Sequence, residues 1–192
     1  MVKVGVLALQ GDFAEHIQVL DAMGVEALEV RLPHDLRKVD ALIIPGGEST
    51  TIARLMKSFG LAQEIKSAVG EGMPTWGTCA GMIVLAREIV EDRPESLGLI
   101  DIQVRRNAFG RQVDSFEADI DVPSLGGAPF RAVFIRAPVI EGIGPGVKPL
   151  AYLSDHQVVA AQEGHVLVTS FHPELTHDQR FHSYFLKIPV GS

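Results

Sequence analysis

Cysteine is almost missing from this chain of 192 residues, which carries only Cys79. A single cysteine excludes an intramolecular disulfide, so the fold must rest on its hydrophobic core, as suits a reducing compartment. Long apolar runs are missing too, because none approaches the roughly 18 residues of a membrane-spanning helix. Residues 1–5 enter a strand pattern directly and do not resemble a signal peptide. We therefore expect a soluble, cytoplasmic protein with no membrane partner.

Positive charge is also scarce. The 17 basic residues are outnumbered by 24 acidic ones, and no basic cluster is longer than Arg105-Arg106. Nucleic acid is therefore excluded as an expected partner. Metal-site patterns are absent, since there is no cysteine pair and no HExxH, and His177 and His182 are badly spaced for one helix face. Phosphate-binding glycine motifs are absent as well. We predict no metal and no cofactor.

The apolar content of 46% is enough for one sizeable core. The chain shows no internal repeat, low-complexity segment or linker, so we predict one domain over residues 1–192.

Short apolar runs alternate with helical periodicity in the first half of the chain. Residues 4–9 and 41–44 have the continuous apolar character of strands buried on both faces. Asp12 and Glu15 resemble a capping box that opens a helix ending near residue 24. Further helices are expected over residues 52–59 and 61–69, a strand at 75–77, and a helix over 82–86. This order indicates strand–helix units.

The second half alternates in the manner of antiparallel hairpins. Strands are expected over residues 113–120, 132–135, 151–153, 157–161 and 165–171, with a closing helix over 176–186. We interpret the hairpins as an elaboration of one sheet. The predicted fold is α/β, a flavodoxin-like three-layer sandwich whose mixed central sheet is largely parallel.

The segment Gly77-Thr78-Cys79-Ala80-Gly81 places the cysteine on a turn between a strand and a helix. A nucleophile on such a strained turn needs small neighbours, and the glycines and Ala80 meet that need. The helix N-terminus favours a thiolate. Taken alone, a single cysteine is equally well a small buried hydrophobe.

The segment His172-Pro173-Glu174 follows a buried strand and supplies an imidazole and a carboxylate. Glu174 would orient His172 as the third member of a catalytic triad does. The alternatives are a core histidine with satisfied hydrogen bonds and a solvated carboxylate. With Cys79, the segment predicts a Cys-His-Glu hydrolase.

Reactive groups gather beyond the carboxyl ends of strands in an open α/β sheet. Gln10, Gly46-Gly47, Cys79 and His172 all lie at predicted strand ends. The N–H groups of Gly47 and Ala80 would then form an oxyanion hole. Gly46-Gly47 is alternatively only a turn that leads into a helix.

The Gly77–Gly81 turn, a nucleophile-elbow pattern, and the distal His172-Pro173-Glu174 segment together resemble class I, triad-type glutamine amidotransferases. Longer blocks resemble the glutaminase subunit of the two-component pyridoxal 5′-phosphate synthase (the PdxT/SNO family), over about residues 3–187. These blocks are Leu9-Gln10-Gly11-Asp12-Phe13, Pro45-Gly46-Gly47-Glu48-Ser49-Thr50-Thr51, the stretch from Arg105 to Gln112, Phe134-Ile135-Arg136-Ala137-Pro138 and Phe171-His172-Pro173-Glu174-Leu175.

The resemblance implies that the chain hydrolyses L-glutamine to L-glutamate and ammonia for vitamin B6 biosynthesis. It implies a (β/α)8-barrel synthase partner, in a complex of about 12 copies of each subunit. It also implies that the glutaminase is weak until the synthase docks near Gln10 and Gly46. The implied glutamine contacts are Gly47, Glu48, Ser49, Arg106, Ile135 and Arg136. An arginine suits the α-carboxylate of glutamine, although a surface salt bridge is the alternative for either arginine.

Other interpretations use the same residues. A glutaminase for a different synthase, a γ-glutamyl hydrolase and a cysteine peptidase would each keep the triad. A non-catalytic module would be expected to lose Cys79, His172 or Glu174, and the sequence retains all three.

Overall fold

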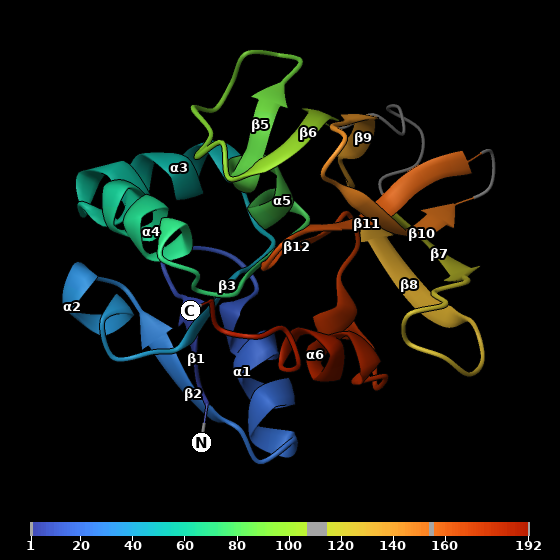
Figure 1. Cartoon of the computed structure of the whole chain (residues 1–192), viewed down its shortest axis with the longest axis horizontal. Coiled ribbons are helices and arrows are strands. Elements are labelled where there is room, and N and C mark those ends of the chain that lie inside the picture. The colour runs from blue at the N-terminus through green and yellow to red at the C-terminus, as the bar shows by residue number, and fades with distance from the viewer. Residues whose placement is uncertain (1, 107–114, 154–155, 192) are drawn as a thin grey trace.

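The computed structural model describes residues 2–106, 115–153 and 156–191. Within these ranges, a seven-stranded sheet has the strand order β10-β11-β12-β4-β3-β1-β2 (Figure 1). The strands from β2 to β12 pair in parallel, whereas β11 and β10 continue the sheet antiparallel. The bounds are β1 Lys3–Leu7, β2 Glu26–Val30, β3 Ala41–Ile44, β4 Thr75–Thr78, β10 Lys148–Leu153, β11 Gln157–Glu163 and β12 Val166–Thr169.

Helices cover both faces of this sheet (Figure 1). They are α1 Phe13–Ala22, α2 Pro33–Leu36, α3 Ser49–Ser58, α4 Leu61–Gly70, α5 Ala80–Leu85 and α6 Arg180–Phe185. One hydrophobic cluster packs α2, α3, α4 and α5 against one face, and a second packs α1 and α6 against the other. The predicted three-layer α/β sandwich is confirmed.

Strand β3 shows why the buried strands lack polar alternation. All four of its residues are buried. Leu42 and Ile44 belong to one cluster, and Ala41 and Ile43 belong to the other. Successive side chains of a strand point to opposite faces, so a strand covered on both faces must be apolar throughout.

The prediction that all hairpins elaborate one sheet was wrong in part. Only β10 and β11 join the central sheet. Two further sheets form in the described residues, one from β5 Ala86–Ile89, β6 Ile100–Arg105 and β9 Val139–Ile143, the other from β7 Ser115–Ile120 and β8 Phe130–Ile135. The β7–β8 pairing is antiparallel, as expected. The predicted strand over 113–120 begins on residues that lie outside the described ranges.

The expectations missed several short or half-exposed elements, including β2, β5 and β9. Strand β2 lies at the sheet edge and has only one fully buried residue, Val30, so its hydrophobic pattern is weak. Edge strands need no continuous apolar run, which is the signal used to predict β1 and β3.

The closing helix is shorter than predicted. Pro173–Leu175 forms a separate 3-10 turn, η2, and α6 begins only at Arg180. The Thr176 hydroxyl donates to the Pro173 carbonyl and accepts from the Asp178 N–H. These side-chain bonds offer the backbone an alternative to the helix between the two elements.

Within the described ranges, every helix is too short or too polar to span a bilayer.

Candidate active site

Cys79 lies where β4 ends and α5 begins. Its φ of 48° is unusual for a residue with a side chain, which marks a strained turn of the kind predicted. The Cys79 N–H donates to the Thr169 carbonyl at 2.8 Å, and the Cys79 carbonyl accepts from the Ile83 N–H. The turn is therefore fixed from both sides. The thiol points toward the Ile135 carbonyl, with Sγ 3.7 Å from that oxygen.

Glycine is required at Gly81 because the elbow packs against strand β3. A Cβ at Gly81 would overlap the Ile44 carbonyl oxygen, and Gly81 in turn crowds Gly77. The two glycines of the motif thus allow α5 to start directly against the sheet.

His172 and Glu174 form the expected pair. Nδ1 of His172 is 2.7 Å from Oε1 of Glu174, and both side chains are almost completely buried. The backbone N–H of His172 donates to the Val133 carbonyl at 2.8 Å, and this bond fixes the residue to β8. The imidazole therefore has a defined orientation.

The protonation of His172 is set by its partners. Burial lowers the pKa of its imidazole, but hydrogen bonds with Cys79 and Glu174 outweigh burial and raise it to about 10. This pKa favours an imidazolium at neutral pH, beside Cys79. Burial also raises the pKa of Glu174, against the lowering effect of His172.

Asp12 has a different role from the one that its sequence position indicates. Its side chain makes no capping hydrogen bond to α1, so the predicted capping box was wrong. Instead, Oδ2 of Asp12 lies 3.4 Å from Nδ1 of His172. Burial raises the pKa of Asp12 although the nearby His172 lowers it. The neighbouring imidazole is the partner that draws this carboxylate away from the helix end.

Almost all the predicted site residues line one cavity of about 440 Å³. The residues from the predicted set are Gln10, Gly47, Glu48, Ser49, Cys79, Ala80, Arg106, Ile135, Arg136 and His172. Asp12 and Ile83 also line it and were not predicted. Ile83 had a local signal, since it lies one turn after Cys79 on α5, whereas the sequence pattern at Asp12 indicated a helix cap.

Two predicted residues lie behind the cavity wall. Glu174 is buried behind His172. Gly46 packs against the same imidazole, and a Cβ at Gly46 would overlap Cε1 of His172. A glycine is therefore needed where the β3–α3 loop passes the imidazole.

The β3–α3 loop is held by Gln10. Oε1 of Gln10 accepts from the Glu48 N–H at 2.7 Å, and the Asp12 N–H donates to the Gly46 carbonyl at 3.0 Å. Gly47 has a φ of 153°, which favours glycine. The loop thus brings Gly47 to the cavity opposite Ala80, the first residue of α5, where helix N–H groups have no partner within the helix.

Glu48 is engaged with its own helix. Its carboxylate accepts from the N–H groups of Thr50 and Thr51 at the start of α3. These hydrogen bonds lower the pKa of Glu48, although partial burial opposes them. Its carboxylate is thus an N-cap, while its backbone N–H donates to Gln10 and its carbonyl accepts from the Ile52 N–H.

Arg106 is held at the cavity rim. Its Nη2 lies 3.6 Å from Oε1 of Glu48, and its Nη1 donates to the Arg93 carbonyl at 3.3 Å. The rest of the motif that ends at Gln112 falls on residues 107–114, outside the described ranges. Ile135 is the last residue of β8 and Arg136 follows it; both line the cavity, and Arg136 has a positive φ of 42°.

Asp12, His172 and Glu174 are the one group in the described ranges with ligand atoms close enough for a metal, all within 4.8 Å of one another. The ring nitrogen that faces both carboxylates is Nδ1 of His172, which is hydrogen-bonded to Glu174. A protonated Nδ1 has no lone pair for a metal. The geometry therefore suits a proton better than a metal ion, and the expected absence of a metal stays a prediction.

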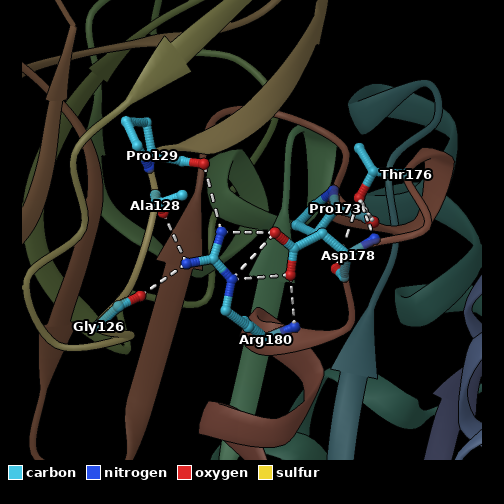
Figure 2. A network of polar contacts seen from close by, with 7 residues as sticks. All are labelled: Gly126, Ala128, Pro129, Pro173, Thr176, Asp178 and Arg180. Atoms are coloured by element: carbon cyan, nitrogen blue, oxygen red, sulfur yellow. Dashed lines mark hydrogen bonds and ion pairs between the residues drawn. The ribbon is translucent and has the colours of Figure 1, made fainter.

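The segment that carries Glu174 is tied to the β7–β8 hairpin by Arg180 (Figure 2). The Arg180 guanidinium donates to the carbonyls of Gly126 and Ala128 at 2.7 and 2.8 Å, and it pairs with Asp178. It also lies 5.8 Å from the centre of the Phe130 ring. The hairpin that carries Ile135 and the turn that carries Glu174 are therefore joined at a second point beyond the His172–Val133 bond.

The comparisons with known proteins identify a family. Residues 6–190 match the model of the SNO glutamine amidotransferase family. The pyridoxal 5′-phosphate synthase subunit PdxT of Herpetosiphon aurantiacus is 60% identical, over 95% of this chain and 98% of the relative. The PdxT of Dehalococcoides mccartyi (strain ATCC BAA-2266 / KCTC 15142 / 195) is 56% identical, over 97% and 96%. A crystal structure of a glutamine amidotransferase superposes with a TM-score of 0.92 at 52% identity, covering 96% of this chain and 97% of the other.

With nearly its whole length matched, this chain belongs to the SNO glutamine amidotransferase family.

Proposed function

We propose that this chain is the glutaminase subunit of a pyridoxal 5′-phosphate synthase, hydrolysing L-glutamine and supplying the ammonia to a (β/α)8-barrel synthase subunit. The observation that carries the proposal is the contact series from Cys79 through His172 to Glu174 at the wall of a cavity, in a chain 60% identical to a PdxT subunit.

The reaction begins with attack of the Cys79 thiolate on the side-chain carbonyl carbon of glutamine. A C–S bond forms and the carbonyl electrons move to oxygen. When the oxyanion collapses, the C–N bond breaks, and the His172 imidazolium gives its proton to the departing nitrogen, which leaves as ammonia. His172 then takes a proton from water, which attacks the thioester. The C–S bond breaks, and glutamate and the thiolate are released.

The oxyanion is proposed to accept from the N–H groups of Gly47 and Ala80. Both residues line the cavity together with Cys79. Glu174 holds the imidazolium and its orientation through the 2.7 Å contact.

The substrate is proposed to lie between the two rims of the cavity. Arg106 would bind its α-carboxylate, since a guanidinium matches a carboxylate in geometry and charge. Glu48 and Ser49 at the start of α3, and Ile135 and Arg136 at the end of β8, would bind the amide and the ammonium group.

Activation by the partner is proposed to act through Gln10 and Gly46. Gln10 holds the Glu48 N–H, and Gly46 packs on His172, so docking that moves Gln10 would move the peptide at Gly47. We propose a complex of about 12 copies of each subunit, in the cytoplasm, with residues 1–192 acting as one domain.

The direct test is ammonia release from glutamine, titrated with the barrel subunit. We expect a rate that rises with the partner and saturates at one partner per chain. Equal rates with and without the partner would rule out the activation, and no release under any condition would rule out the glutaminase.

The control variant is Cys79→Ala in the assembled complex. Synthesis driven by glutamine should be lost, while synthesis driven by added ammonia should continue. Loss of both would mean that the subunit does more than supply ammonia.

A further inference from the structure

Two buried histidines lie directly behind the proposed triad. His16 comes from α1 and His182 from α6, two helices that pack on the same face of the sheet (Figure 1). Both side chains are 0% exposed. The reaction described above uses neither of them. Buried polar groups need partners, so their contacts are informative.

The contacts form a continuous series that ends at the triad. Nε2 of His16 lies 3.3 Å from Oε2 of Glu174, and also 3.3 Å from Oγ1 of Thr78. Nδ1 of His16 lies 3.0 Å from Nε2 of His182. The series thus continues from His172 through Glu174 and His16 to His182.

The surroundings of His182, the last residue of the series, determine which ring nitrogens carry the protons. Nδ1 of His182 is buried and has no hydrogen-bond partner among the described residues. A buried N–H without an acceptor is rarer than a buried acceptor without a donor, so the proton of neutral His182 belongs on Nε2. There it donates to Nδ1 of His16. His16 must then carry its own proton on Nε2, which faces Glu174 and Thr78.

This arrangement places a possible hydrogen-bond donor, Nε2 of His16, near the unpartnered oxygen of Glu174. Oε1 of Glu174 accepts from His172, whereas Oε2 is buried without a hydrogen bond of good geometry in the described part of the chain. An unpartnered buried carboxylate oxygen is costly, and Nε2 of His16 lies 3.3 Å from it, although the hydrogen bond of good geometry from that nitrogen is to the Thr78 hydroxyl.

We propose that His16 is a positioning residue for the glutaminase reaction, donating from Nε2 to Glu174 while His182 fixes its tautomer. This inference rests on the proposed function. It extends the triad by two residues that never touch the substrate.

Both histidines must be neutral for the series to work, and their surroundings favour that state. Burial lowers the pKa of His182 to about 4. Burial lowers the pKa of His16 well below its usual value, and the nearby His182 and His172 lower it further. The ionisable groups that face Glu174 are His16 on one side, and His172 with Asp12 beyond it on the other.

The competing interpretation is packing alone, since both rings contact Trp76 edge to face, at 5.7 Å for His16 and 4.9 Å for His182. Packing requires no particular tautomer, whereas positioning requires Nε2–H on both rings. A different tautomer therefore excludes positioning, and the kinetics of His16 variants separate positioning from packing.

The first measurement is two-bond ¹H–¹⁵N correlation of the imidazoles in the unchanged, ¹⁵N-labelled chain at about pH 7. We expect neutral Nε2–H tautomers for His16 and His182. An Nδ1–H tautomer at His16, or a protonated His16, would overturn the proposal. This readout does not depend on glutaminase activity, so a failure of the proposed function is detected separately in the ammonia assay.

The second measurement compares His16→Leu with His16→Gln in the complex with the barrel subunit. The leucine removes the donor, and we expect kcat to fall roughly 100-fold while KM stays within about threefold. The glutamine keeps an N–H near the position of Nε2 and should recover about tenfold of that loss. The acid limb of the pH–kcat profile should move to higher pH in the leucine variant.

The matched control is His165→Leu. His165 is a half-buried histidine bonded to the Val69 carbonyl at 2.7 Å, before the start of β12 and away from the cavity. The His165→Leu substitution should lower the melting temperature of the chain without lowering kcat. If His16→Leu folds and retains full kcat, or if glutamine rescues nothing at equal stability, the positioning role is wrong. If His16→Leu does not fold, the tautomer measurement decides.

Discussion

The two sides of the His172 imidazole differ in their chemistry. On the open side, His172 contacts Cys79 and lines the cavity proposed to bind glutamine. On the closed side, Glu174 separates it from two buried histidines. The pKa of His172 is raised to about 10, whereas burial lowers that of His182 to about 4.

Burial acts in the same direction on all three histidines, because it disfavours an imidazolium. Only His172 has hydrogen-bonding partners, Cys79 and Glu174, that outweigh this effect. Within one contiguous region, partner identity and not burial therefore decides which imidazole holds a proton at neutral pH.

The largest effect is expected from Glu174→Gln, which removes the carboxylate that lies between His172 and His16. An amide cannot stabilise the imidazolium and favours the wrong tautomer, so kcat should fall about 10³-fold, or roughly 4 kcal/mol in transition-state free energy. Without the carboxylate, Cys79 alone opposes burial, so the pKa of His172 should fall below about 10. Steady-state kinetics and an NMR titration of His172 measure the two effects.

The control for this change is Glu64→Gln, which replaces an exposed carboxylate on α4. An unchanged His172 titration in Glu174→Gln would mean that Glu174 does not set its protonation.

The next effect concerns the closed side alone. The pKa of His182 is about 4 in the fold and about 6.5 when unfolded, so the unfolded state takes up the proton first as pH falls. This contribution to stability is complete above about pH 6.5 and is lost as pH falls toward about 4, by about 3 kcal/mol. His182→Gln should flatten the fall of the unfolding free energy with acid, measured by urea titration at several pH values.

His177→Gln provides the comparison, since it replaces an exposed histidine between η2 and α6. Its curve should overlie that of the unchanged chain. A His182→Gln curve as steep as the original would show that His182 is not held neutral.

The next prediction concerns substrate binding on the open side, and the variant that tests it is Arg106→Ala. If Arg106 binds the α-carboxylate of glutamine in both ground and transition states, KM should rise about tenfold, or about 1.4 kcal/mol, with little change in kcat. The neighbouring Arg105→Ala removes an exposed arginine paired with Glu141, and it should leave KM unchanged. An equal rise in both variants would point to overall charge and away from a specific contact.

The smallest effect is expected from Arg180→Lys, which leaves both sides of His172 chemically intact. A lysine cannot hold the carbonyls of Gly126 and Ala128 together with Asp178, as Arg180 does in Figure 2. The unfolding free energy should fall by about 1 kcal/mol. We expect kcat of the folded variant to stay unchanged. If kcat falls although the variant remains folded, the hairpin also positions Glu174.

The catalytic candidates were accessible to sequence reasoning because each carries a local signal. Cys79 lies on a glycine-flanked elbow, and His172 follows a continuous apolar strand. Strand ends converge in a parallel sheet, so the grouping of Gln10, Gly47, Cys79 and His172 at one cavity follows from the order of strands and helices.

Asp12 and His16 were not accessible in the same way. At the start of α1, Asp12 has the pattern of a helix cap, but the fold places His172, 160 positions later in the chain, beside it. His16 is one turn further along the same helix, where a polar residue ordinarily faces solvent. Nothing near it in sequence predicts that α6 and η2 will cover it.

The sequence by itself determined the fold class, the nucleophile elbow and the imidazole–carboxylate pair, because those depend on apolar periodicity and on residues adjacent in the chain. Only the tertiary structure decided the protonation of the buried histidines and the role of Asp12. These depend on burial and on partners distant in sequence, and electrostatic and hydrogen-bond energies are set by distances in space.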